Sequence, residues 1–398
     1  MSHESVTPAH AVDPDALRRA RTAVFVAFAA SGFGFASWAS RLPDIKVRLD
    51  LTPGQLGTLL LTTAAGSILG LPASGAIIAR LGTRRTVEFA ATLFASGLAL
   101  AAIGVSFLGS VWPTGFGMFL MGLGMGCWDV AMNHEGAGVE RLGGRAIMPW
   151  FHAAFSGATV VGALIGAAAT FAGLPIWLHL AGVVAMIGYV AAVGVRAFLP
   201  EAEVADDGPG SAHPGKSAWL EPRTLMVGLV VLVAAFTEGT ANDWVAIALT
   251  DGYQLPSWAG VLGFATFLGA MTAGRILGTG ALDRYGRVPV LYAMFGLAIV
   301  GSILVVFGGP VLAYLGTVLW GVGGSLGFPV GMSAASDDPA RAAARLSVVA
   351  TIGYLAFLGG PPLVGYLGDH IGVLKALLAV GALLVPALLA VPATRERR

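Results

Sequence analysis

Twelve long apolar runs organise this sequence of 398 residues. Each run is about 20 residues or longer, the length that an α-helix needs to cross a hydrocarbon core about 30 Å thick. Six runs precede a polar stretch rich in proline, glycine and acidic residues, and six follow it. The runs lie at 22–42, 54–79, 86–106, 112–134, 149–172, 175–197, 223–249, 257–281, 288–307, 310–333, 345–368 and 373–393. The sequence therefore predicts an all-α membrane protein with twelve transmembrane helices.

The composition agrees with this prediction and excludes several functions. Hydrophobic residues make up 56% of the chain and charged residues 11%, whereas soluble proteins carry about 25% charged residues. A net charge of +1 without a basic block argues against a nucleic-acid partner. The single cysteine, Cys127, excludes an intrachain disulfide and a CxxC redox site. No catalytic triad, phosphate loop or HExxH helix is visible, so we expect no enzyme, cofactor or bound metal.

Short motifs recur in the two parts of the chain. Gly122-Leu-Gly124-Met-Gly126 in the fourth run matches Gly321-Val-Gly323-Gly-Ser325 in the tenth. An offset of about 200 residues indicates a duplicated six-helix unit. We predict two pseudo-symmetric six-helix bundles, divided into an N-terminal tail (1–21), a first bundle (22–198), a linker (199–222), a second bundle (223–394) and a C-terminal tail (395–398).

Basic residues are distributed unevenly between the two predicted membrane surfaces. If the amino terminus lies inside, 18 of the 23 Lys and Arg residues fall on the cytoplasmic side, four fall outside, and Arg275 lies within a span. Because basic residues concentrate on the cytoplasmic side of membrane proteins, we expect both termini and the linker to lie in the cytoplasm.

One carboxylate falls in a stretch that otherwise reads as buried in lipid. Asp129 lies twelve residues before Arg141, which we place at the inner surface. At about 1.5 Å per residue it is roughly 18 Å deep, near the bilayer centre. Asn133 follows four residues later and shares its helix face. Such a carboxylate needs a partner or a wet cavity, so we interpret both residues as cavity-lining; a structural hydrogen bond to a neighbouring helix is the alternative.

The seventh run carries a second polar group. Glu238 lies fifteen residues after Arg223, about 22 Å deep, and Asn242 shares its face. Asp129 and Glu238 thus supply one acid from each half at neighbouring depths. A desolvated carboxyl group can exchange a proton near neutral pH, which suits either acid for proton coupling. A hydrogen-bonded helix contact is the alternative.

Two further polar residues fall inside predicted spans. His152 lies seven residues after Arg145, about 10 Å above the inner surface. Its imidazole can relay protons or donate to a solute hydroxyl, or simply bond to another helix. Arg275 either extends toward the inner surface or offsets a carboxylate.

Four tryptophans lie at or near these polar positions: Trp38, Trp128, Trp150 and Trp244. An indole ring can stack on the apolar face of a sugar, and tryptophan also anchors membrane interfaces and fills helix contacts. We place Trp38 and Trp128 in the predicted cavity.

Arg41 and Asp243 each lie about twenty residues from cytoplasmic basic residues, near the outer surface. The first and seventh spans are equivalent in the duplication. We therefore hypothesise an outer gate in which Arg41 and Asp243 make contact when the cavity faces inward; two independent interfacial charges are the alternative.

Two loops repeat a pattern of glycine and arginine. The loop after the second run contains Gly75, Arg80, Gly82, Arg84 and Arg85. The loop after the eighth run contains Asp283, Arg284, Gly286 and Arg287. Both resemble the G-x-x-x-D-R-x-G-R-R signature of the major facilitator superfamily, and the resemblance covers almost the whole chain. It implies twelve helices around a central cavity and a role in moving solutes across a membrane.

The resemblance also implies that these loops act as inner gates, because the signature aspartate clasps the facing helix and holds the inner side closed. Asp283 fills that position in the second half, and Ala79 replaces it in the first. Thr83 and Thr279 depart from the signature at an arginine and at the leading glycine. We expect the second half to make the inner latch.

Three further segments resemble the fucose-permease-like bacterial branch: Trp38-Ala-Ser-Arg41-Leu-Pro43, Asp129 with Asn133, and Trp150-Phe-His152. In that branch an acidic residue of the fourth helix is tied to proton-coupled sugar uptake, and its position matches Asp129. The resemblance implies symport in a bacterial cytoplasmic membrane. The Gly-Pro signature of antiporters is missing from the fifth run.

The sequence therefore predicts a secondary active transporter that moves a small polar, possibly sugar-like solute by alternating access with proton coupling. Its expected partners are the lipid bilayer, the solute and the proton, and we expect a monomer. The alternatives are an exporter of amphipathic compounds, an uncoupled facilitator, and a membrane receptor that has lost transport. Buried acidic residues favour transport over the receptor alternative, because a purely structural protein gains nothing from the free-energy cost of desolvating them.

Overall fold

The computed structural model describes residues 13–144, 147–200, 217–338 and 341–396. Within these ranges the chain is helical and contains no strand. Parts of the predicted tails and linker (1–12, 201–216 and 397–398) lie outside the described residues, as does Arg145.

The first half contains seven helices in the described ranges, one of them short. They are α1 (Pro14–Ala39), α2 (Leu42–Arg48), α3 (Pro53–Leu81), α4 (Thr83–Ile103), α5 (Val111–Gly143), α6 (Met148–Phe171) and α7 (Ile176–Tyr189). Two π-helical turns, Gly104–Leu108 and Val190–Gly194, extend α4 and α7.

The second half begins with a 3-10 turn at Ala218–Leu220 and ends with another at Val391–Thr394. Between them lie α9 (Pro222–Tyr253), α10 (Ser257–Tyr285), α11 (Arg287–Phe307), α12 (Gly309–Gly324), α13 (Gly327–Ala335), α14 (Ala342–Ile371), α15 (Val373–Ala376) and α16 (Leu378–Ala387).

These helices account for the twelve predicted spans. Among the described residues, eleven helices are long and apolar enough to cross a membrane, and Val373–Ala387 forms a shorter apolar one. The predicted tenth span is interrupted between α12 and α13, and the twelfth between α15 and α16. The seven-residue helix α2 lies between the first and second spans and has no predicted counterpart.

Local sequence explains several helix ends. Thr52 accepts a hydrogen bond from the Gln55 amide, and the Gln55 side chain accepts one from the Thr52 amide, so a capping box starts α3. Gly82 and Gly286 separate α3 from α4 and α10 from α11, with φ of 79° and 78°. Only glycine adopts this backbone without strain, and the matching pair supports the duplication.

Glycines also let helices approach closely at equivalent places in both halves. A Cβ atom on Gly124 of α5 would lie 2.5 Å from the Phe94 amide nitrogen of α4. A Cβ atom on Gly323 of α12 would lie 2.5 Å from the Met294 carbonyl oxygen of α11. Side chains do not fit at such distances, so these glycines allow close helix packing at equivalent places in both halves.

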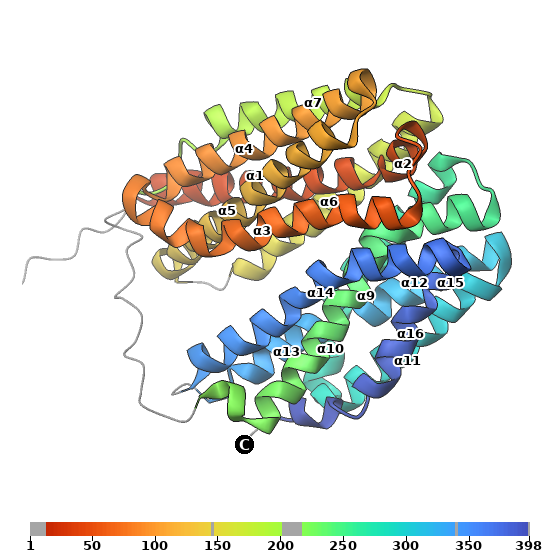
Figure 1. The fold of residues 1–398 in the computed structure, drawn as a ribbon. Coiled ribbons are helices and arrows are strands. Elements are labelled where there is room, and N and C mark those ends of the chain that lie inside the picture. Colours follow the sequence, from red (N-terminus) through yellow and green to blue (C-terminus); the bar gives the residue numbers. More distant parts are fainter. Residues whose placement is uncertain (1–12, 145–146, 201–216, 339–340, 397–398) are drawn as a thin grey trace, which may run out of the picture.

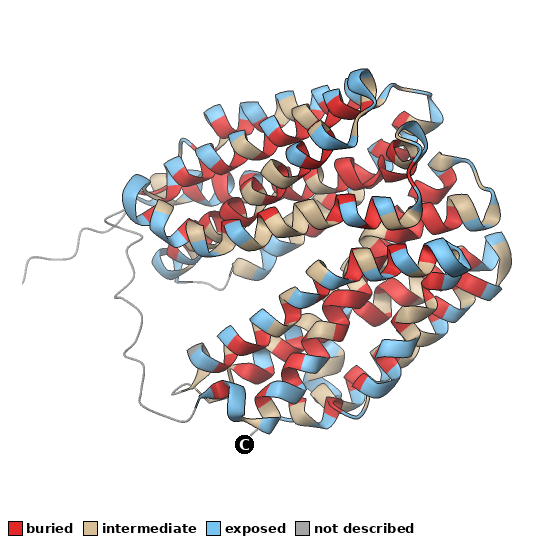
Figure 2. Ribbon diagram, viewed as in Figure 1, coloured by how far each residue is buried: buried red, intermediate tan, exposed pale blue. Residues whose placement is uncertain are grey.

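The two bundles meet mainly along α3 with α14 and α6 with α10, while α2 reaches α9. They come together at the end where α2 and α15 lie, and diverge toward the linker ends (Figure 1). Buried residues gather inside each bundle (Figure 2). Large apolar side chains on the outside are suited to contact lipid, among them Phe107, Trp112, Leu277, Val311 and Leu389.

Candidate functional site

Asp129 and Asn133 share one face of α5, as predicted. The Asn133 amide donates to the Asp129 carbonyl oxygen at 2.8 Å and to its carboxylate at 3.3 Å. Both residues are half-buried. Among the residues that the structure describes, no cation forms an ion pair with Asp129. Its carboxylate therefore accepts a hydrogen bond from one amide and, within the described ranges, has no cation to fix its charge.

The charge of Asp129 on α5 acts on the Tyr354 hydroxyl of α14, which belongs to the second half. No hydrogen bond joins the two groups within the described residues. Tyr354 is half-buried and brings a hydrogen-bonding group to the space between the halves. The sequence alone does not single out Tyr354, because one tyrosine in an apolar run is an ordinary membrane residue.

Glu238 and Arg275 form an ion pair within the second half. The Arg275 guanidinium on α10 lies 2.8 Å from the Glu238 carboxylate on α9, and also donates to the Ser325 carbonyl oxygen at 3.3 Å. Ser325 lies at the break between α12 and α13, where the helix leaves its carbonyl available. Of the two alternatives for Arg275, the structure supports the one in which it offsets a carboxylate.

Asn242 lies one turn beyond Glu238 on the same helix. Its side-chain amide oxygen is buried and has no hydrogen-bond partner among the described residues, so this acceptor is unused in the present conformation. Asp243 is half-buried and likewise forms no ion pair within the described ranges, and Trp244 is fully buried.

His152 extends the cluster from the first half. The residue is exposed, and its ring lies edge-on to Phe28 at 5.1 Å. The charge of Arg275 acts on this imidazole, so His152 faces the second half. Polar groups from α5 and α6 therefore face polar groups from α9, α10 and α14.

The predicted placement of two tryptophans in the cavity is wrong for this conformation. Trp128 is fully buried and packs edge-on against Phe94 inside the first bundle, with ring centroids 6.1 Å apart. Trp38 is 3% exposed. Neither indole reaches a solute between the halves without repacking. Trp150, in contrast, is exposed at the start of α6.

The predicted outer gate between Arg41 and Asp243 is also wrong. Arg41 is 1% exposed, and all its hydrogen-bond partners among the described residues belong to the first half. Its donors reach His179 Nδ1 at 3.0 Å, Asp44 at 3.0 Å, Thr170 at 3.1 Å and the Leu174 carbonyl at 3.0 Å.

Depth explains this error. Arg41 lies just beyond the end of α1, whereas Asp243 lies ten residues before Tyr253, where α9 ends. At about 1.5 Å per residue, Asp243 is roughly 15 Å deeper than the end of its helix. The ion pair that joins the halves at this level is Lys46 with Asp251, at 2.9 Å.

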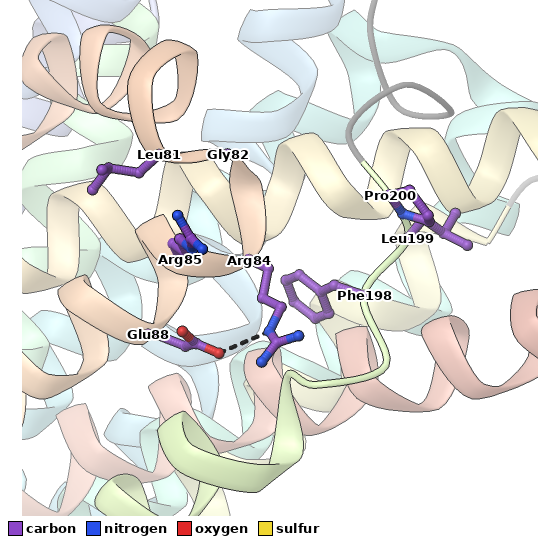
Figure 3. A pocket seen from close by; sticks show the side chains of 8 residues that line it. All are labelled: Leu81, Gly82, Arg84, Arg85, Glu88, Phe198, Leu199 and Pro200. Carbon is purple, nitrogen blue, oxygen red and sulfur yellow. Dashed lines mark hydrogen bonds and ion pairs between the residues drawn. The ribbon is translucent and has the colours of Figure 1, made fainter.

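The first-half loop makes polar contacts to its own bundle, where the Thr83 hydroxyl lies 3.1 Å from His134 Nδ1 of α5. Arg84 and Glu88 form an i,i+4 ion pair at 2.8 Å, while Gly75 and Arg80 are exposed. A surface cavity of about 370 Å³ adjoins this loop (Figure 3), lined by Leu81, Gly82, Arg84, Arg85, Glu88, Phe198, Leu199 and Pro200. It lies at the linker end of the first half, away from the polar cluster, so we assign it no solute.

The second-half loop is tied into its own bundle. Arg287 bonds to Asp337 at 2.8 Å and to the Ser333 hydroxyl at 2.9 Å, and Arg223 bonds to the other Asp337 oxygen at 2.8 Å. Burial alone would raise the pKa of Asp337, but hydrogen bonds and charges from Arg223 and Arg287 outweigh it and lower that pKa. The Glu396 carboxylate accepts from the Arg287 amide at 2.9 Å.

The expected clasp by Asp283 is not made in this conformation. Asp283 is exposed and forms no ion pair within the described ranges, and Arg284 lies over the Tyr285 ring at 5.1 Å. The halves diverge on this side (Figure 1), which separates Asp283 from the facing bundle. Arg287 is the residue that anchors this loop.

Comparison with known proteins places this arrangement in a family. A family model for the Major Facilitator Superfamily matches residues 23–361. An uncharacterized MFS-type transporter of Yersinia pestis is 32% identical over 350 residues, which cover 86% of this chain and 88% of that protein. The membrane protein MosC of Rhizobium meliloti is 30% identical over 365 residues, covering 90% and 86%.

Solved transporters share the fold. The nucleoside transporter NupG superposes with a TM-score of 0.74 at 13% identity, covering 96% of this chain and 100% of NupG. A bacterial homologue of the human lysosomal transporter Spinster, inward-facing and unoccupied, gives 0.73 at 13%, covering 97% and 99%. FucP in the outward conformation gives 0.58 at 14%, covering 94% and 99%. At these identities the likeness shows the fold.

Proposed function

The chain belongs to the Major Facilitator Superfamily, and we propose that it is a secondary active transporter that carries a small polar, sugar-like solute together with protons. The observation that carries the proposal is the Asp129 carboxylate, which faces the second half without a cation to neutralise it. Keeping an unpaired carboxylate at membrane depth costs free energy, so its presence there indicates a function.

Proton coupling follows from the cost of closing the cavity. An unpaired carboxylate loses its remaining hydration when the two halves close around it, and an isolated charge is expensive in such a space. A neutral carboxyl group avoids that cost. Closure therefore favours protonated Asp129, and the proton crosses the membrane with the solute.

The other polar groups bind the solute. Asn133, Asn242, His152 and the Tyr354 hydroxyl supply hydrogen-bond donors and acceptors suited to hydroxyl groups. The Glu238–Arg275 pair adds a charged donor and a charged acceptor without net charge. Such a site recognises neutral polar molecules better than ions.

We place the linker end of the molecule in the cytoplasm of a bacterium, with both termini on that side, and the two bundles at 22–198 and 223–394. The charge distribution of the sequence supports this orientation. The divergence of the halves toward the linker then makes this an inward-open state (Figure 1). The better superposition on the inward-facing Spinster homologue than on outward FucP supports the same assignment.

Transport into proteoliposomes tests the proposal. We expect accumulation of at least one solute from a panel of monosaccharides, polyols and nucleosides when a pH gradient is imposed, and only equilibration without one. Asp129→Asn should abolish accumulation while solute exchange persists, because a permanently neutral side chain still permits closure.

Asp243→Asn is the matched control, since Asp243 is another half-buried acid without an ion pair in the described structure. We expect this variant to accumulate solute as the wild type does. Intact accumulation in Asp129→Asn, or its loss in Asp243→Asn alone, would show that Asp129 is not the coupling acid.

A further inference from the structure

The two halves touch backbone to backbone at the end away from the linker. A Cβ atom on Gly57 of α3 would lie 2.5 Å from the Pro361 carbonyl oxygen of α14. A Cβ atom on Gly365 of α14 would lie 2.6 Å from the Pro53 carbonyl oxygen of α3. We call this contact, between 53–57 of α3 and 361–369 of α14, the outer seam. It closes only because glycine lies at these positions.

A carboxylate from one half caps a helix of the other half at the seam. Asp369, in the last turn of α14, accepts a hydrogen bond from the Gly54 amide at 3.0 Å and lies 3.5 Å from the Thr52 hydroxyl. Gly54 is in the first turn of α3, where amides lack partners within the helix and the helix dipole favours an anion. This cap exists only while the halves are together.

An ion pair provides a second clip beside the seam. Lys46 on α2 lies 2.9 Å from Asp251 near the end of α9, with side chains 17% and 33% exposed. The buried bonds of Arg41 to Asp44, Thr170 and the Leu174 carbonyl fix the start of α2 against α6 and the residues that follow it. In the second half α9 passes to α10 through 254–256 without a helix like α2.

We propose that the outer seam and its two clips, Asp369 with Gly54 and Lys46 with Asp251, form the outer lock that holds the inward-open state. The Lys46–Asp251 clip has no equivalent built from the second half, because α2 occurs in the first half alone among the described residues. Each transport cycle must break it, so its strength sets the balance between inward-open and outward-open molecules. The inference rests on the proposed transport cycle for its purpose, and it is tested without any solute.

Substitutions that force the outer seam apart (wedge variants) test the outer lock most directly. In a Cys127→Ala background, spin labels on Val111 and Val311 report the outer end, and labels on Leu142 and Leu220 report the linker end; all four residues are exposed. In liposomes, Gly57→Ala and Gly365→Ala should each lengthen the outer distance and shorten the inner one. Alanine favours helix more than glycine does, so such a shift comes from the contact.

The control is a glycine of α14 outside the seam and outside the gate loops. Gly359 has open space where a Cβ would lie, so Gly359→Ala should leave both distances unchanged. Unchanged distances in the wedge variants, or an equal shift in Gly359→Ala, would overturn the outer lock.

The clips are tested by milder changes that keep the fold. Lys46→Gln or Asp251→Asn should raise the outward-open to inward-open ratio about twofold to fivefold, as expected for a partly exposed ion pair. The exchanged pair Lys46→Asp with Asp251→Lys should restore the wild-type ratio. An exchanged pair no better than the single variants would remove this clip from the proposal.

These distances are measured without solute or gradient, so they decide the outer lock whatever the transport assays show. A shift on wedging without transport of any solute would retain the lock and reject the proposed function. Coupled transport together with unchanged distances in the wedge variants would retain the proposed function and reject the outer lock.

Discussion

Each half contributes one acidic residue to the polar cluster, and the two residues have different partners. Asp129 of the first half is solvated by Asn133, whereas Glu238 of the second half is paired with Arg275 at 2.8 Å. A nearby cation favours the charged form of a carboxylate, so pairing fixes its charge, while an amide leaves it free to change. In the proposed mechanism the first half therefore carries the proton, and the second half holds a constant charge.

The largest expected effect comes from giving Asp129 the partner that Glu238 has. Tyr354→Arg introduces a guanidinium on α14 at a position where the charge of Asp129 is felt. The ion pair should hold the carboxylate charged, and accumulation driven by a pH gradient should fall at least tenfold. The measurement is the accumulation ratio in proteoliposomes.

Tyr354→Phe is the control for this change, because it removes the hydroxyl and adds no charge. We expect it to keep gradient-driven accumulation and to weaken solute binding about fivefold to tenfold, as for the loss of one hydrogen bond. Full coupling in Tyr354→Arg would contradict the distinction between the two acids.

The second prediction removes the constant charge. Arg275→Gln leaves Glu238 without its cation and should lower both transport and stability, the latter by on the order of 1 kcal/mol, because the pair is partly exposed. The double variant Arg275→Gln with Glu238→Gln should recover most of the stability, because no unpaired charge remains. Thermal unfolding of the single and double variants in detergent measures this, and a double variant no more stable than Arg275→Gln would count against the pairing argument.

How much of this arrangement the sequence reveals depends on how far apart the residues are. The shared face of Asp129 and Asn133 follows from a spacing of four, and their hydrogen bond confirms it. The spans follow from hydrophobic length. The Glu238–Arg275 pair joins residues 37 apart on two helices, and its geometry depends on how each helix is rotated, which periodicity alone does not determine.

Depth and short elements account for the remaining errors. Counting residues from basic anchors placed Arg41 and Asp243 at one level, although Asp243 lies ten residues before the end of α9. Helix α2 is too short and too charged to give an apolar run, so the sequence does not predict it or the ion pair of Lys46 with Asp251. The break at Ser325 lies in a glycine-rich run that reads as one helix.

The third prediction compares the two inner loops. Arg287 bonds to Asp337 and Ser333, whereas Arg84 bonds to Glu88 on an exposed helix surface. Arg287→Gln should lower the free energy of unfolding by about 1–2 kcal/mol, since it breaks a half-buried network. Arg84→Gln should cost no more than about 0.5 kcal/mol, typical of an exposed i,i+4 pair. Thermal melts of both variants make the comparison, and equal losses would contradict it.

The smallest effect concerns acid stability of the second half. The pKa of Asp337 is lowered in the fold because Arg223 and Arg287 outweigh its burial. Its pKa in the unfolded chain is about 3.9. The unfolded chain therefore takes up a proton first as the pH falls, so the stabilising contribution of Asp337 is complete above about pH 5 and is lost as the pH falls through the folded pKa.

Asp337→Asn provides the test of this sign. Near pH 7 the variant should melt below the wild type, because Arg223 and Arg287 lose their shared carboxylate. The difference should begin to narrow as the pH falls below about 4, because the unfolded wild-type chain then takes up a proton while the folded carboxylate stays charged, and it should close below the lowered folded pKa. A gap that stays constant down to pH 3 would mean that hydrogen-bond geometry, rather than the charge of Asp337, holds the second-half loop in its bundle.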